Sequence, residues 1–216
     1  MASATALGLQ YESRTHQSLT AVAGMWLFLA TEVLFFGGLI LAWIYSRHWN
    51  RYGFDLGGRE TELWIGTVNT AILITSSFVY ASGLAFIRAG DCRRMVQCCS
   101  LALLLGLSFL ALKFGLEWRE DFAHQLFPAA SVFKISGAGE GGAKLFFVFY
   151  FVSTALHGLH MLVGVALLLW IILRAQRGDF SSGYHTPVEV VGLYWSFVDI
   201  VWLTLYPLIY LIGRSA

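Results

Sequence analysis

Several polar side chains stand inside long apolar stretches of this 216-residue chain, and each is of a type that could do chemistry there. Glu32 is the clearest case, because it lies halfway along an apolar run. A charged group at the centre of a bilayer costs about 2.5–3.5 kcal/mol on insertion scales. A carboxyl at such a depth therefore takes up a proton or finds a hydrogen-bond donor. A hydrogen bond between helices and a proton-linked or lipid-linked role both remain open for Glu32.

Two histidines lie in a second apolar run, in the sequence STALHGLHMLVG. His157 and His160 are three residues apart, so a helix would place them on one face, where two imidazoles could belong to a metal or haem site. The other histidines, His16, His48, His124 and His185, all lie outside the apolar runs. The three cysteines, Cys92, Cys98 and Cys99, are too few for a tetrahedral thiolate site. We therefore expect no metal and no redox centre in this chain, and hydrogen bonds from His157 and His160 to a carboxyl or a lipid head group.

Four further polar residues suit structural roles inside a membrane. Asp199 lies in the middle of the last apolar run, and we expect it to find a partner in a neighbouring helix or subunit. Lys113 and Glu117 are one helical turn apart and can pair, but long charged side chains near a helix end usually extend to the membrane surface. Asn69 lies among small and hydroxylated residues that help membrane helices to pack. No catalytic residue is expected.

The composition shows which elements must position these groups. Hydrophobic residues make up 57% of the chain and charged residues only 12%, whereas a soluble domain carries about 25% charged residues. The net charge of +1, without a basic stretch, argues against a nucleic-acid partner, which demands a dense positive surface. The sequence therefore indicates an integral membrane protein.

Five stretches are long enough to cross a bilayer as helices, since a crossing needs roughly 20 apolar residues. None of them alternates apolar with polar residues as a barrel strand would. We predict an all-α fold, a polytopic membrane helix bundle with five transmembrane helices. The polar segment 1–20, which has no features of a signal peptide, precedes a single transmembrane domain, 21–212. The predicted spans are 21–44, 63–87, 96–116, 145–173 and 188–212, and Glu117 to Lys144 is predicted to be a flexible loop.

The distribution of the basic residues indicates an orientation in the membrane. Five spans put the two termini on opposite sides, with six basic residues on the N-terminal side and seven on the other. The stretch RAGDCRR concentrates three arginines in the shortest connection. Because positive charge near the membrane favours the cytoplasmic side, we expect a cytoplasmic N-terminus.

Four motifs together resemble subunit III of the haem–copper oxidases. They are GMWLFLATEVLFFGG (24–38), GTVNT (66–70), FVSTALHGLHMLVG (151–164) and GLYWSFVDIVWLTLYPLIYL (192–211). They occur in the order that the family has, and the resemblance covers nearly all of the chain from Gly24 onward. The chain is most similar to the five-helix bacterial form, which lacks the two helices that open the seven-helix version.

The resemblance implies roles for several of the residues named above. Glu32 matches the intramembrane glutamate of the family's E-V-x-F-F motif, His157 and His160 match its H-G-L-H motif, and Asp199 matches its F-V-D motif. It implies a lipid-binding or proton-linked role for Glu32, His157 and His160, with no haem or copper in this subunit. One departure is Ser196, which stands where the resemblance implies a histidine, so this chain lacks the imidazole that family members commonly have there.

The resemblance also implies a function and partners. The expected function is that of a non-catalytic subunit of a cytochrome c oxidase of the aa3 type, which supports phospholipid binding, complex stability and sustained proton uptake. Its partners would be the catalytic subunit I, which with other subunits carries the haem and copper, and phospholipid, and a respiratory supercomplex is compatible with this. The expected location is the bacterial inner membrane, with the C-terminus outside. Alternatives are the same subunit in a quinol oxidase, a helper of nitric oxide reductase and, in another class, an independent proton or ion transporter.

Overall fold

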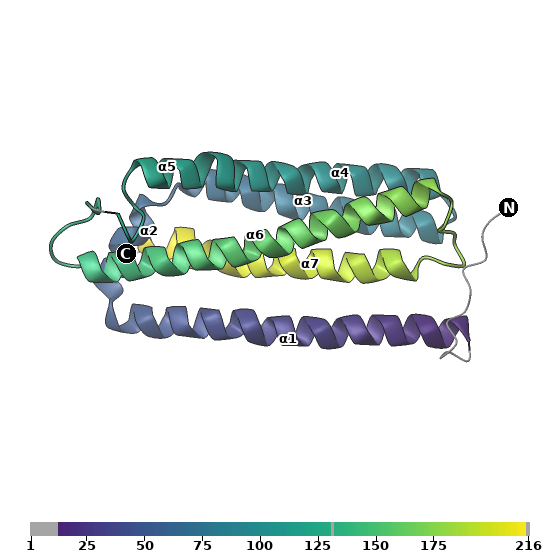
Figure 1. Ribbon diagram of the computed structural model, residues 1–216, viewed down its shortest axis with the longest axis horizontal. Coiled ribbons are helices and arrows are strands. Elements are labelled where there is room, and N and C mark those ends of the chain that lie inside the picture. The colour runs from purple at the N-terminus through teal and green to yellow at the C-terminus, as the bar shows by residue number, and fades with distance from the viewer. Residues whose placement is uncertain (1–12, 131, 215–216) are drawn as a thin grey trace.

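The computed structural model describes residues 13–130 and 132–214, and within them the chain is a bundle of long helices (Figure 1). The expected cytoplasmic position of Gln10 lies outside the described residues. Five helices of the described part are long and apolar enough to cross a membrane. This confirms the predicted fold class. The β structure found in these residues is one isolated bridge, between Ser181 and Tyr184.

The helices extend beyond the spans predicted from hydropathy. α1 covers Arg14–Trp49, α3 covers Leu63–Arg88, α6 covers Glu140–Gln176 and α7 covers Thr186–Tyr206. α4, Cys92–Leu110, continues through a π-helical segment, Ala111–Glu117, into α5, Trp118–Ala123. α7 likewise continues through a π-helical segment, Pro207–Leu211, into a 3₁₀ turn, Ile212–Arg214. Hydropathy finds the apolar centre of a helix, whereas its polar ends carry the same backbone hydrogen bonds into the interface.

Two of the connections differ from the expectation. A short helix, α2 (Arg51–Glu60), occupies the connection between the first two spans. The loop predicted from Glu117 to Lys144 is shorter, because α5 continues to Ala123 and α6 already begins at Glu140. The second half of the glycine-rich SGAGEGG therefore belongs to a helix.

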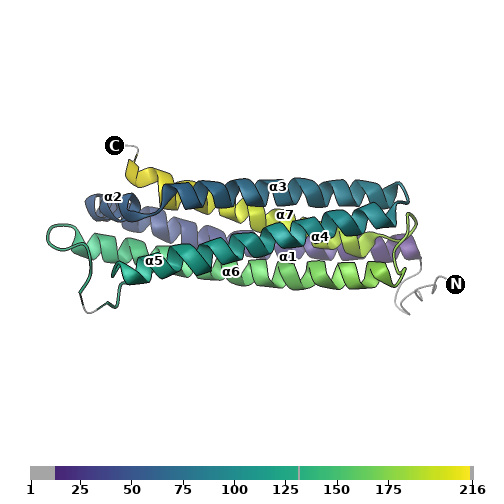
Figure 2. The same ribbon diagram turned by 90° about the horizontal axis from the view of Figure 1, so that it is seen from above.

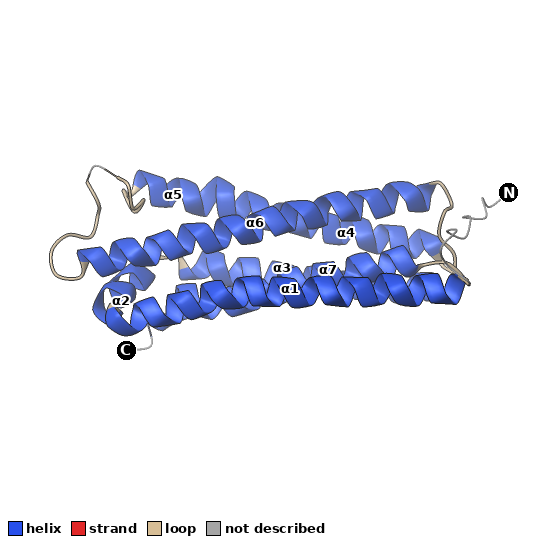
Figure 3. Ribbon diagram, turned by 60° about the horizontal axis from the view of Figure 1, so that its bottom comes forward, coloured by secondary structure: helices blue, strands red, loops and turns tan. Residues whose placement is uncertain are grey.

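α7 lies at the centre of the bundle and α1 at its edge. In the most apolar 18 residues of the last span, half of the residues are buried within the protein. In the corresponding part of α1, only 17% are buried. Figure 1 and Figure 3 show α1 running along the outside of the group formed by α3, α4, α6 and α7. α1 therefore presents most of its surface to lipid or to another chain.

Glycines permit the central tryptophan of α7 to fit between its neighbours. A Cβ at Gly106 of α4 would lie 2.6 Å from the Trp195 ring, and one at Gly164 of α6 would lie 2.9 Å from it. The Trp195 indole N–H donates to Ser76 Oγ of α3 at 3.1 Å. One side chain thus joins three helices to α7.

Different connections between the helices lie at the two ends of the bundle. Figure 2 shows the start of α1 at the same end as the α3–α4 and α6–α7 connections, with α2, α5 and the end of the helix that continues α7 at the opposite end. The arginines of RAGDCRR therefore lie at the N-terminal end. This arrangement sets the depth of each intramembrane polar group.

Candidate functional site

Glu32 of α1 and His160 of α6 form a polar pair across the edge of the bundle. Glu32 Oε2 lies 3.1 Å from His160 Nε2, and the two side chains retain 18% and 16% of their exposure. His160 Nδ1 lies 2.8 Å from the Leu156 carbonyl oxygen, which can only accept a hydrogen bond. Nδ1 therefore carries a hydrogen.

The hydrogen bond between His160 Nε2 and Glu32 Oε2 then contains one proton, which either the imidazole or the carboxyl can hold. A protonated Glu32 can donate to a neutral imidazole, or a charged imidazolium can donate to a Glu32 carboxylate. Phe36 of α1 packs edge-on against the His160 ring, with centroids 5.1 Å apart. The pair thus has a fixed geometry and an adaptable charge distribution.

His157 does not join this pair, although it lies on the same helix three residues away. Its side chain is 1% exposed and packs between the Phe109 ring, at 5.4 Å, and the Trp202 ring, at 5.1 Å. Neither ring nitrogen has a hydrogen-bond partner among the described residues. The expected hydrogen bond of His157 to a carboxyl is therefore wrong, because the ring points into the bundle towards α4 and α7.

Asp199 and Asn69 are both buried within the bundle. Asp199 Oδ2 accepts a hydrogen bond from Ser77 Oγ of α3, while its Oδ1 has no partner in the described part of the chain. Asn69 is fully buried, and in residues 13–130 and 132–214 neither its amide nitrogen nor its amide oxygen has a partner. These groups face protein rather than acyl chains.

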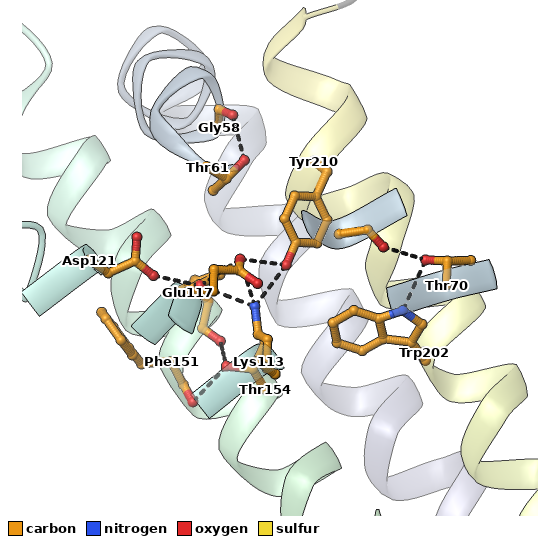
Figure 4. A network of polar contacts seen from close by, with 12 residues as sticks. Gly58, Thr61, Thr70, Lys113, Glu117, Asp121, Phe151, Thr154, Trp202 and Tyr210 are labelled. Carbon is orange, nitrogen blue, oxygen red and sulfur yellow. Dashed lines mark hydrogen bonds and ion pairs between the residues drawn. The ribbon is translucent and has the colours of Figure 1, made fainter. Parts of the chain in front are cut away.

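Lys113 and Glu117 do not extend to the membrane surface, and that expectation is wrong. Both side chains are 1% exposed, and Lys113 Nζ lies 2.9 Å from Glu117 Oε1 (Figure 4). Lys113 Nζ also donates to the hydroxyls of Tyr210, at 2.7 Å, and Tyr150, at 3.1 Å. The pair is buried because hydroxyls on α6 and on the π-helical segment after α7 supply the hydrogen bonds that water would provide at the surface.

Three members of this buried network were not found from the sequence. Tyr150 donates to Asp121 Oδ2 at 2.6 Å or to Glu117 Oε1 at 2.9 Å, and Tyr210 donates to Glu117 Oε1 at 2.6 Å. Helical spacing gives a signal for one of them, because Asp121 follows Glu117 by four residues.

No group of three or more histidine, cysteine or acidic side chains that could hold a metal ion occurs within the described residues. The buried network contains one lysine with its acidic and hydroxyl partners, and the second polar site consists of Glu32 and His160. What these arrangements can do is to hold protons and to tie helices together.

Comparison with known proteins identifies the family. The family model described as "Cytochrome c oxidase subunit III" matches residues 10–214. The chain belongs to the cytochrome c oxidase subunit III family. A protein named cytochrome c oxidase subunit 3 from Thermostichus vulcanus is 33% identical over 195 residues, which are 89% of this chain and 88% of the relative.

Two other relatives carry the same name. The one from Synechocystis sp. is 35% identical over 190 residues, covering 88% of this chain and 74% of the relative. The one from Sus scrofa is 33% identical over 195 residues, covering 87% and 67%. Members of the subunit III family are non-catalytic subunits of the terminal oxidase. The quinol oxidase, nitric oxide reductase and transporter alternatives are not favoured.

Proposed function

We propose that this chain serves as the non-catalytic subunit III of a cytochrome c oxidase and that it holds phospholipid beside α1. The observation that carries the lipid proposal is a cavity of about 490 Å³ between α1, α6 and the start of α7. The polar residues that line it include Gln17, Ser18 and His185, close to the ends of α1 and α7, and the apolar ones include Leu167 and Val190, further along α6 and α7. This gradient suits a lipid head group above acyl chains.

A second cavity lies on the other side of α1, against α3 and α7. It has about 300 Å³ and is lined by Trp26, Tyr80, Leu193 and Ser196 among others. Arg88 and Glu189 also line it and form an ion pair at 2.5 Å. The serine at position 196 leaves room here that the imidazole common in the family would fill.

The Glu32–His160 pair would provide the proton-linked part of the function. Haem and copper belong, on this proposal, to partner subunits, above all to the catalytic subunit I. The chain therefore acts on oxygen chemistry indirectly, by holding lipid against its partners and by placing an adaptable charge close to them. The location that we propose is the bacterial inner membrane, with the N-terminal end of the bundle in the cytoplasm.

The test compares the complete oxidase with a complex from which this chain has been removed. We expect the haem spectrum and the initial rate of oxygen consumption to be retained without the chain. We expect activity then to be lost within many turnovers, faster at high pH, where protons are scarce. Mass spectrometry of co-purifying phospholipid should show fewer lipids per complex.

Two outcomes would contradict the proposal. Loss of haem absorbance in proportion to the removed chain would show a direct role in holding the redox centres. Equal rates, lifetimes and lipid content at every pH would leave the chain with an assembly role only.

A further inference from the structure

The buried network around Lys113 lies where the two π-helical segments of the described residues meet. Lys113 and Glu117 belong to the segment Ala111–Glu117, and Tyr210 belongs to the segment Pro207–Leu211. π-helical turns are rare in proteins, and those that occur are often found at functional sites. None of the network residues lines either cavity beside α1. The network is thus a separate site from the one that holds lipid.

The hydrogen count at the Tyr150 hydroxyl determines the protonation of the network. Tyr150 Oη lies 2.6 Å from Asp121 Oδ2 and 2.9 Å from Glu117 Oε1, while Lys113 Nζ donates to it. A hydroxyl has only one hydrogen to donate. If both carboxyls were ionised, one of the two short oxygen–oxygen contacts would contain no hydrogen. A proton on Asp121 Oδ2 turns both contacts into hydrogen bonds, from Asp121 to Tyr150 and from Tyr150 to Glu117.

The charge of the network leads to the same count. One lysine faces two carboxyls, so the fully ionised network would have a net charge of −1. Lys113 and Glu117 are 1% exposed and Asp121 is 4% exposed, and an uncompensated charge at such burial is costly. The second oxygen of Glu117, Oε2, is also buried without a hydrogen-bond partner in the described residues.

Within the described residues, no other group that faces the network supplies a compensating positive charge. His157 of α6 packs against the Trp202 ring, which lies 5.6 Å from Lys113 Nζ. Both of its ring nitrogens are buried without a hydrogen-bond partner in the described residues, so a positive charge there would be costly. On α5, Glu120 is a further acidic group and is exposed. Tyr206 on α7 stacks at 5.5 Å from Tyr210 and shares a hydrogen bond with Thr67 of α3. The guanidinium groups of Arg59 and Arg214 donate to the backbone carbonyls of Gly213 and Thr61, respectively, and not to a carboxyl of the network.

We propose that this network is a proton-binding site that holds one exchangeable proton in addition to those of Lys113. The proton enters from water at the C-terminal end of the bundle and binds the Asp121 carboxylate. When Tyr150 passes its hydroxyl hydrogen to Glu117, Asp121 returns one to Tyr150, so the proton moves inward without a change in total charge. The ligand is a proton from solution, and the relay uses only side chains of this chain.

Infrared spectroscopy of the complete oxidase tests the proposal, because a protonated carboxyl has its own C=O stretching band. The complex is prepared with aspartate isotopically labelled at the side-chain carboxyl carbon. We expect a carboxyl band that shifts with the label, shifts again in D₂O because the proton exchanges, and disappears as the pH is raised. Asp121→Asn should remove this band, while the exposed neighbour Glu120→Gln should retain it. Asp199 is also buried, so a labelled band that remains in Asp121→Asn and is lost in Asp199→Asn is assigned to Asp199.

If Asp121→Asn fails to assemble into the oxidase, a second variant that keeps a carboxyl at this position still tests the proposal. Asp121→Glu should retain a carboxyl band that no longer responds to the aspartate label. The proposal is overturned if the native complex shows no such band from mildly acidic to mildly alkaline pH. It is also overturned if Asp121→Asn removes no labelled band, or if the band that it removes fails to shift in D₂O.

Discussion

The two histidines of α6 show how much a single position on a helix decides. His160 meets the Glu32 carboxyl at 3.1 Å, whereas His157 packs against Trp202 without a hydrogen-bond partner in the described part of the chain. Three residues rotate a side chain by about 300° around a helix of 3.6 residues per turn. The remaining offset directs one ring towards α1 and the other towards the bundle interior. The same residue type thus has a polar role at one position and a packing role at the other.

The contribution of Glu32 to stability can be measured by substitution. Glu32→Leu should lower the free energy of unfolding by about 1–3 kcal/mol, because it leaves His160 Nε2 without a partner. Glu32→Gln should cost less, because its amide N–H can donate to the neutral imidazole. Thermal unfolding in detergent measures both, and Glu62→Gln at an exposed position is the control. Equal losses for the leucine and glutamine variants would show that the hydrogen bond contributes nothing.

At the scale of the element, the two π-helical segments supply a buried ion pair and one of its hydrogen-bonding hydroxyls. Lys113, Glu117 and Tyr210 come from the two segments and are joined by bonds of 2.6–2.9 Å. A buried ion pair does not necessarily stabilise a fold relative to apolar residues, but removing one partner leaves an uncompensated charge. The network therefore constrains how α4, α6 and α7 meet.

Substitutions of the ion pair should be strongly non-additive. Lys113→Met should destabilise the protein by about 3–5 kcal/mol, as is typical when one partner of a buried pair is removed. The double variant Lys113→Met with Glu117→Gln should recover most of that loss. Lys144→Met, which breaks the exposed pair with Glu140, should leave stability unchanged. Additive effects of the two network substitutions in unfolding measurements would show that the pair is not coupled.

The glycines around Trp195 give a second prediction for the elements. Gly106→Ala should cost about 1–3 kcal/mol, the usual range for overpacking a well-packed core, because the new methyl would meet the indole ring of Trp195. Gly38→Ala on α1, where no other group lies within 4 Å, is the matched control. An unchanged unfolding midpoint for Gly106→Ala would mean that Trp195 can move without loss.

On the scale of the whole molecule, the placement of α1 separates two kinds of polar site. The Glu32–His160 pair and both cavities lie beside α1 at the edge, whereas the Lys113 network lies among α4, α6 and α7. The edge site can contact lipid or partner subunits directly. The inner network can influence partners only through its charge and through the helices that it joins.

The proposed orientation follows from the arginines at the N-terminal end and can be tested by labelling. In a background with Cys92 and Cys98 replaced by serine, a membrane-impermeant thiol reagent is added outside intact cells. Tyr52→Cys, in the connection around Asp55, should react, and Arg93→Cys, beside Asp91, should be spared. Both positions are exposed, so the reverse pattern would establish the opposite orientation.

The sequence by itself determined the five membrane helices and the hydrogen-bond requirement of Glu32, because span length and the cost of a buried carboxyl are local properties. It did not determine that Lys113 and Glu117 are buried, that His157 packs against Trp202, or that Tyr150, Tyr210 and Asp121 complete one network. Helices such as α6 are apolar on nearly all sides, so their sequence does not show which face meets protein. The contacts between helices decide this, and the π-helical segments alter the side-chain register that an α-helical spacing would give. The polar partners therefore became visible only in the tertiary structure, where residues distant in sequence meet.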